Sequence, residues 1–155
     1  MTKEVLVSIK GTQCMDGEDD SIEIITAGTC YDKNGKWYVL YDEAVEGIEA
    51  ATHNTVKIAK DKIEVTKKGL VDSRMVYEYG KKHNCNYVTP MGLIILGITT
   101  TALTVTEQED RLEVLIEYIL EMNGEYVAGC RLELSAASAV QDRVLKLAGE
   151  RAEIL

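Results

Sequence analysis

Tyrosines and a few charged side chains are the residues of this 155-residue sequence best suited to contact a ligand. The chain contains eight Tyr and one Trp but no Phe. A tyrosine presents an apolar ring and a hydroxyl, which normally needs a hydrogen-bond partner when it is buried. Where such residues alternate along strands they converge on one face. The candidate ligand-binding residues are Trp37, Tyr41, Glu43, Lys57, Arg74, Tyr77, Tyr87, Tyr118 and Tyr126.

Glu43 is the central residue of this hypothesis because it is a carboxylate at the expected end of a strand, where a barrel would open. We expect it to orient a polar ligand group together with tyrosine hydroxyls, and to pair with Lys57 or Arg74. The alternative is that the hydroxyls reach water at the barrel ends and that Glu43 caps a loop.

The remaining reactive residues do not form a recognisable set. His83 and Cys85 are close in sequence and His53 is the only other histidine, whereas a structural zinc site needs four nitrogen or sulfur ligands with short paired spacings. A cysteine–histidine pair lacks an orienting third residue, and Glu43 with Glu78 is a chance pairing among 26 carboxylates. We therefore assign no catalytic residue, no metal ligand and no cofactor.

The net charge of −9 disfavours nucleic acid and anionic membranes as partners, since both are negatively charged. Residues 57–82 depart from this balance, with eight basic and four acidic side chains. The simpler interpretation is a solvated hairpin whose lysines discourage edge-to-edge pairing. The alternative is a local site for an anion or an acidic partner.

Four widely spaced cysteines and an N-terminus without an apolar signal segment predict a cytoplasmic protein with reduced thiols. No apolar run reaches the length of a transmembrane helix.

Residues 3–134 form short alternating runs rich in β-branched side chains, and Asn-Gly pairs stand at 34–35 and 123–124. Asn-Gly between alternating apolar residues predicts a tight β-hairpin. We expect about nine strands, a helix-like or irregular stretch at 44–52 and a polar loop at 81–86. Consecutive antiparallel strands predict an all-β, closed up-and-down barrel. Its inner face would also include Thr26, Cys30, Tyr79, Thr99 and Cys130.

The C-terminal residues have a helical pattern instead. Ser138 and Gln141 fit a capping box, and Val140, Val144 and Leu147 share a helical stripe. The domain prediction is a barrel over residues 1–136 and a short α-helical extension over residues 137–155. Apolar Leu115 and Ile119 on the expected outer face would be covered by this helix or by a second subunit.

Several strand and turn motifs resemble the YwiB-like family of small bacterial proteins. They are GKWYVLYDE at 35–43, NTVKI at 54–58, KKG at 67–69, MVYEYGKK at 75–82 and YVTPMG at 87–92, and the resemblance covers residues 4–134. It implies a calycin-like, lipocalin-like barrel and brings no catalytic residue. Met91 stands where the family tends to have an aromatic residue.

Three functions are compatible with these observations. The first is non-catalytic binding of a small apolar or amphipathic molecule inside the barrel. The second is a structural or protein-interaction module that acts as a homodimer through its outer face and binds no ligand. An enzyme is the least favoured. An inner cavity above roughly 300 Å³ would favour the first over the second.

Overall fold

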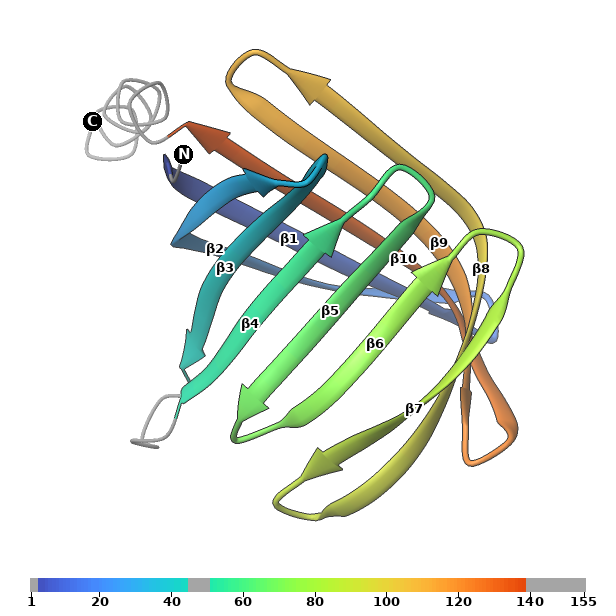
Figure 1. Ribbon diagram of the computed structural model, residues 1–155. Helices are drawn as coiled ribbons and strands as arrows, with labels where there is room; N and C mark the ends of the chain where they lie inside the picture. Colours follow the sequence, from blue (N-terminus) through green and yellow to red (C-terminus); the bar gives the residue numbers. More distant parts are fainter. Residues whose placement is uncertain (1–2, 45–50, 139–155) are drawn as a thin grey trace, which may run out of the picture.

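The computed structural model describes residues 3–44 and 51–138, which fold into a closed antiparallel barrel of ten strands. Around the barrel the strands follow the order β1-β10-β9-β8-β7-β6-β5-β4-β3-β2, so each strand lies beside its neighbours in sequence (Figure 1). The prediction of an all-β closed barrel is confirmed. The strands are β1 (Lys3–Met15), β2 (Glu18–Lys33), β3 (Lys36–Ala44), β4 (Ala51–Ile58), β5 (Lys62–Gly69), β6 (Asp72–Glu78), β7 (Lys82–Thr89), β8 (Gly92–Gln108), β9 (Arg111–Met122) and β10 (Glu125–Ser138).

The two Asn-Gly pairs form the tight hairpin turns that the sequence predicts. Asn34 and Gly35 have φ angles of 54° and 75°, and Asn123 has 50°. Positive φ at both central residues is the geometry of a type I′ turn, whose twist matches that of the flanking strands. Asp16 has the same conformation at 50°, followed by Gly17, so the expected acidic loop is a third turn of this kind.

Two predictions of irregular structure, at 81–86 and 44–52, are wrong for the residues that the structure describes. Residues 82–86 belong to β7, whose side chains alternate between partly covered and exposed. The helix-like stretch at 44–52 overlaps β3 and β4, which supply residues 44, 51 and 52, and its remaining residues 45–50 lie outside the described ranges. The described residues therefore form ten strands where about nine are expected.

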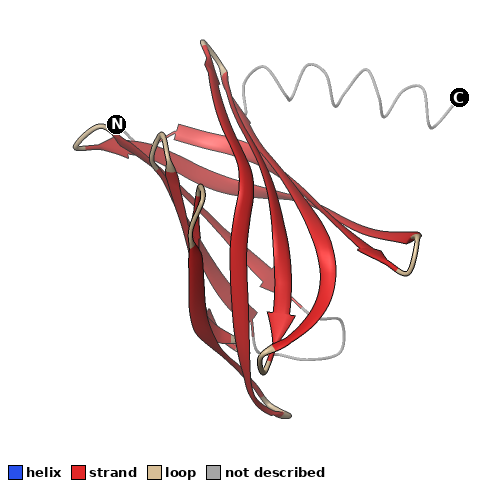
Figure 2. Ribbon diagram, turned by 90° about the vertical axis from the view of Figure 1, so that its right-hand side faces the viewer, coloured by secondary structure: helices blue, strands red, loops and turns tan. Residues whose placement is uncertain are grey.

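The predicted C-terminal helix lies almost wholly outside the described residues. Strand β10 continues to Ser138, two residues past the expected domain boundary at 136. Figure 2 shows strands joined by short turns throughout the described part. No helix long and apolar enough to span a bilayer occurs in residues 3–44 and 51–138.

Buried aliphatic side chains form most of the barrel core. The largest fully buried apolar residues are Ile58, Ile63, Ile98 and Ile116, each at most 1% exposed. Each lies on a different strand, two positions from another buried residue of that strand, as the alternation of a barrel interior requires. Thr100, which is buried beside this core, is the inward residue of β8 where the sequence suggests Thr99.

Strand pairing is incomplete on both sides of the β3–β6 segment. Strand β2 pairs with β3 only over residues 28–33, so residues 18–27 have β1 as their single neighbour. Strands β6 and β7 share only the pairs Asp72–Val88 and Ser73–Tyr87. Residues 18–27 of β2 therefore diverge from β3.

Candidate binding cavity in the barrel

A cavity of about 350 Å³ occupies the barrel interior and is lined by residues of every described strand except β8. Ligand pockets in proteins have volumes of roughly 300–1,000 Å³, so this one suits a small molecule. Its walls are mainly aliphatic. The lining residues are Ile9, Gly11, Ile22, Ile24, Tyr41, Glu43, Val56, Ile63, Val65, Lys67, Met75, Tyr77, Tyr87, Val114, Ile116, Leu132 and Leu134.

An ion pair interrupts the apolar wall near the end of β3. Lys67 Nζ donates to Glu43 Oε1 at 2.7 Å and to Asn54 Oδ1 at 2.8 Å. The Lys67 side chain is 15% exposed and the Glu43 side chain 30% exposed, while Asn54 is buried. Glu43 and Lys67 line the cavity, so their charges face it, and Asn54 bonds the ammonium from the strand between them.

Two tyrosines bring hydroxyl groups to the same region. Tyr41 is buried, and burial together with the negative charge of Glu43 raises its pKa well above the ordinary value. The same causes, in the same order, raise the pKa of Tyr87. Neither hydroxyl has a hydrogen-bond partner among residues 3–44 and 51–138. Both are therefore neutral groups that are free to bond a ligand.

Two further tyrosines pack against each other, and one of them lines the cavity. Tyr77 lines the cavity and meets Tyr118 edge to face, with ring centroids 5.0 Å apart. Burial raises the pKa of both tyrosines far above its usual range. The neighbouring Tyr118 hydroxyl adds to the shift of Tyr77, and the neighbouring Cys130 thiol adds to that of Tyr118. Tyr118 lies behind Tyr77 and does not line the cavity, so its contribution there is packing.

The structure brings together four of the nine predicted ligand-binding residues, namely Tyr41, Glu43, Tyr77 and Tyr87. The other predicted residues lie elsewhere. Trp37 is at the opposite end of β3, where its indole N–H donates to the Glu107 carboxylate. Tyr126 is 67% exposed beside a turn, and Tyr79, expected on the inner face, is 63% exposed.

The partner of Glu43 is Lys67, and the expectation of Lys57 or Arg74 is wrong. Lys57 points outward, with its Nζ 6.0 Å from the centre of the Tyr38 ring. Arg74 is also outside the barrel and bonds Glu64 at 3.1 Å. Of the basic residues in 57–82, Lys67 is the one that lines the cavity.

Sequence reasoning missed Lys67 and Asn54, although the alternation of their strands places them inside. Asn54 precedes the buried Val56 and Ile58 at a spacing of two, and Lys67 follows the buried Ile63 and Val65 in the same way. The signal in the sequence is a polar residue at the next inward-facing position of an alternating strand.

The two histidines pair with carboxylates that do not line the cavity. His53 Nδ1 lies 2.7 Å from Asp42 Oδ1, and His83 Nε2 lies 2.9 Å from Glu78 Oε1. Among the described residues no three His, Cys, Asp or Glu side chains are grouped to hold a metal ion. All four cysteines are free, and the cytoplasmic location stays a prediction.

Comparison with known proteins identifies the relatives of the chain. A family model described as a domain of unknown function, DUF1934, matches residues 7–134. The crystal structure of the YwiB protein from Bacillus subtilis superposes with a TM-score of 0.78 at 20% sequence identity, covering 89% of this chain and 93% of that one. The search of curated proteins gave no match. The resemblance to YwiB-like proteins is thus confirmed, and at this identity the structural likeness concerns the fold.

Proposed function

The chain belongs to the DUF1934 family, and from the geometry of its barrel we propose that it binds a small apolar or amphipathic molecule without catalysing a reaction. The observation that carries this proposal is the cavity of about 350 Å³ with mainly aliphatic walls. Apolar cavities of this size inside barrels are suited to hold one small ligand. Burial of the ligand's apolar surface would supply the driving force.

The cavity has an opening that a ligand can use. Ile22 and Ile24 line it from the part of β2 that has no neighbour on the β3 side. Ile22 is 71% exposed although its position in the strand faces inward. An apolar side chain that is directed at the cavity and still meets water marks the mouth.

The polar groups of the cavity favour binding over catalysis. Glu43 and Lys67 are bonded to each other, so neither is poised as a free base or acid. Burial keeps Tyr41, Tyr77 and Tyr87 protonated. These groups are arranged to orient a ligand.

Native mass spectrometry of the protein purified from cells tests this proposal. We expect a fraction of the protein to carry a small molecule, and a panel of lipids and metabolites to raise the melting temperature through binding to the folded state. A protein that is always free of ligand and unmoved in melting temperature by the whole panel would count against it.

A second candidate function, self-association, is favoured by the unpaired edge of β2. Residues 18–27 present free backbone groups, and Ile25 on the outer face is 60% exposed. Such an edge is a template for another strand. In an antiparallel pair of two copies centred between residues 22 and 23, the acidic residues 18–20 would lie opposite the uncharged residues 25–27.

Sedimentation velocity tests the homodimer. If β2 edges pair, the wild type will form a concentration-dependent dimer and Ile25→Lys will abolish it. Val88→Lys is the matched control, because Val88 is also exposed but lies on β7. A monomer at every concentration would rule the dimer out.

A further inference from the structure

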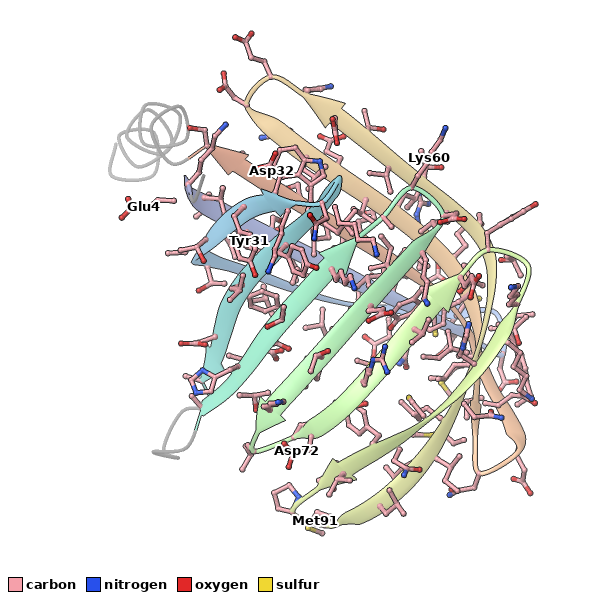
Figure 3. All side chains as sticks on the ribbon, in the orientation of Figure 1. Glu4, Tyr31, Asp32, Lys60, Asp72 and Met91 are labelled. Carbon is pink, nitrogen blue, oxygen red and sulfur yellow. The ribbon has the colours of Figure 1, made fainter. Side chains whose placement is uncertain are left out.

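The polar groups of the cavity are gathered at one end of the barrel. Glu43, Lys67 and Tyr87 come from β3, β5 and β7, which all run toward that end. Asp72, the first residue of β6, and Met91, in the turn after β7, mark the same end in Figure 3, and Lys60 marks the opposite one. The cavity therefore has a polar end and an aliphatic body.

The charges at this end already cancel. Lys67 carries one positive charge and Glu43 one negative charge, and their atoms are 2.7 Å apart. A ligand carboxylate would place two negative charges around one ammonium, and a ligand amine would place two positive charges around one carboxylate. In a partly buried site such an excess charge is poorly screened and unfavourable. A charged head group is thus disfavoured with either sign.

The hydrogen-bonding groups that remain free at this end include both donors and acceptors. An ammonium has three donors, and Lys67 uses two of them on Glu43 and Asn54. Glu43 Oε2 has no bonded partner among the described residues and can accept. The Tyr41 and Tyr87 hydroxyls can each donate and accept. A head group that both donates and accepts would satisfy this set.

We propose that the ligand is an uncharged amphipathic molecule, with a hydroxyl or primary amide held between Lys67, Glu43 and Tyr87 and an aliphatic body lying in the apolar part of the cavity. This inference rests on the proposed binding function. The body would contact the side chains of Val56, Ile63, Val65, Val114 and Ile116.

Four ligands with one chain and different head groups test the proposal. Octan-1-ol, octanamide, octanoate and octylamine are titrated by calorimetry at pH 7, where the last two are charged. We expect the alcohol and the amide to bind with dissociation constants about tenfold lower than those of both charged compounds. Tighter or equal binding of octanoate or octylamine would overturn the inference and leave the binding function intact. Binding of none of the four would contradict both the inference and the binding function.

Glu43→Gln tests the charge argument directly, because it leaves Lys67 without a countercharge. We expect this variant to bind octanoate about tenfold more tightly than the wild type does. Glu64→Gln is the matched control, since Glu64 pairs with Arg74 and Lys62 outside the barrel. Unchanged octanoate affinity in Glu43→Gln would contradict the proposal.

Lys67→Met provides the reciprocal test, and it also serves if Glu43→Gln does not fold. The variant leaves the Glu43 carboxylate alone, so we expect octylamine to become the preferred ligand of the four. If the variant ranked the four ligands by affinity as the wild type does, the ion pair would not select the head group.

Discussion

Lys67 and Glu43 project from two strands that are separated by β4, and their side chains meet inside the barrel with Nζ 2.7 Å from Oε1. Asn54 on the intervening strand bonds the same ammonium. The pair therefore ties three strands together at the polar end of an otherwise aliphatic cavity. We expect it to contribute to stability and, under the proposed binding function, to ligand selectivity, and the two roles can be separated.

The stability role predicts that Lys67→Met lowers the free energy of unfolding by about 1–3 kcal/mol, because a partly buried carboxylate and the Asn54 carbonyl lose their donor. Lys62→Met is the control. Its ion pair with Glu64 spans 3.4 Å, its side chain is 41% exposed, and its loss should cost less than about 1 kcal/mol. Urea denaturation measures both, and equal losses would refute the role assigned to Lys67.

Truncation of a side chain in the buried core should lower stability more than truncation at the cavity mouth. Ile58→Ala removes a side chain that is 1% exposed, so we expect a loss of about 2–5 kcal/mol in the free energy of unfolding. Ile22→Ala removes one that is 71% exposed, and we expect a change within about 0.5 kcal/mol. A large loss for Ile22→Ala would mean that this residue is covered in solution.

The turn at Asn34 predicts a difference between two substitutions at one site. With φ at 54°, Asn34→Gly should leave stability nearly unchanged, whereas Asn34→Val should lower it by about 1–2 kcal/mol because a β-branched side chain is strained there. Thermal unfolding of the two variants checks the prediction. Similar melting temperatures would argue against the type I′ turn.

The buried tyrosines predict a loss of stability in alkali. Burial raises the pKa of Tyr41 above the value of about 10 expected for an unfolded chain, so the folded state keeps its proton longer. The resulting stabilisation is complete below about pH 10 and is lost as the pH rises toward the folded-state pKa. Tyr41→Phe should flatten this loss, as measured by urea denaturation from pH 8 to 11.

Tyr126→Phe is the control for this pH dependence, because Tyr126 is 67% exposed. Its unfolding free energy should fall with pH as the wild type's does. A flattening as large as that of Tyr41→Phe would show that burial of Tyr41 is not the cause.

Much of the fold could be predicted because its determinants are local. The turns at Asn34 and Asn123 need only two residues each, and the alternation between them sets which side chains point inward. Strand β7 was missed because Asn84 and Asn86, which are poor strand formers, occupy its outward positions. Cys85 and Tyr87 nevertheless point inward at alternate positions, which is the pattern of a strand.

The site was predicted less completely than the fold. Tyr41 and Glu43 follow the alternation of β3 and reach the cavity as expected. Charge alone favours Lys57 and Arg74, although each stands between two inward residues and must point outward. Lys67 meets the inward criterion, but only the closed barrel shows that the nearby Glu43 compensates its burial.

The central claim, that the barrel interior is a binding site, is tested most directly by blocking it. A Cβ built on Gly11, which lines the cavity, meets no atom within 4 Å, so Gly11→Leu projects into the empty space. Gly129 on β10 is equally open but does not line the cavity, which makes Gly129→Leu the matched control. Calorimetric titration with octan-1-ol should show one saturable site in the wild type and in Gly129→Leu, and binding at least about tenfold weaker in Gly11→Leu. Equal affinity in all three proteins, or no saturable binding to the wild type, would contradict the account.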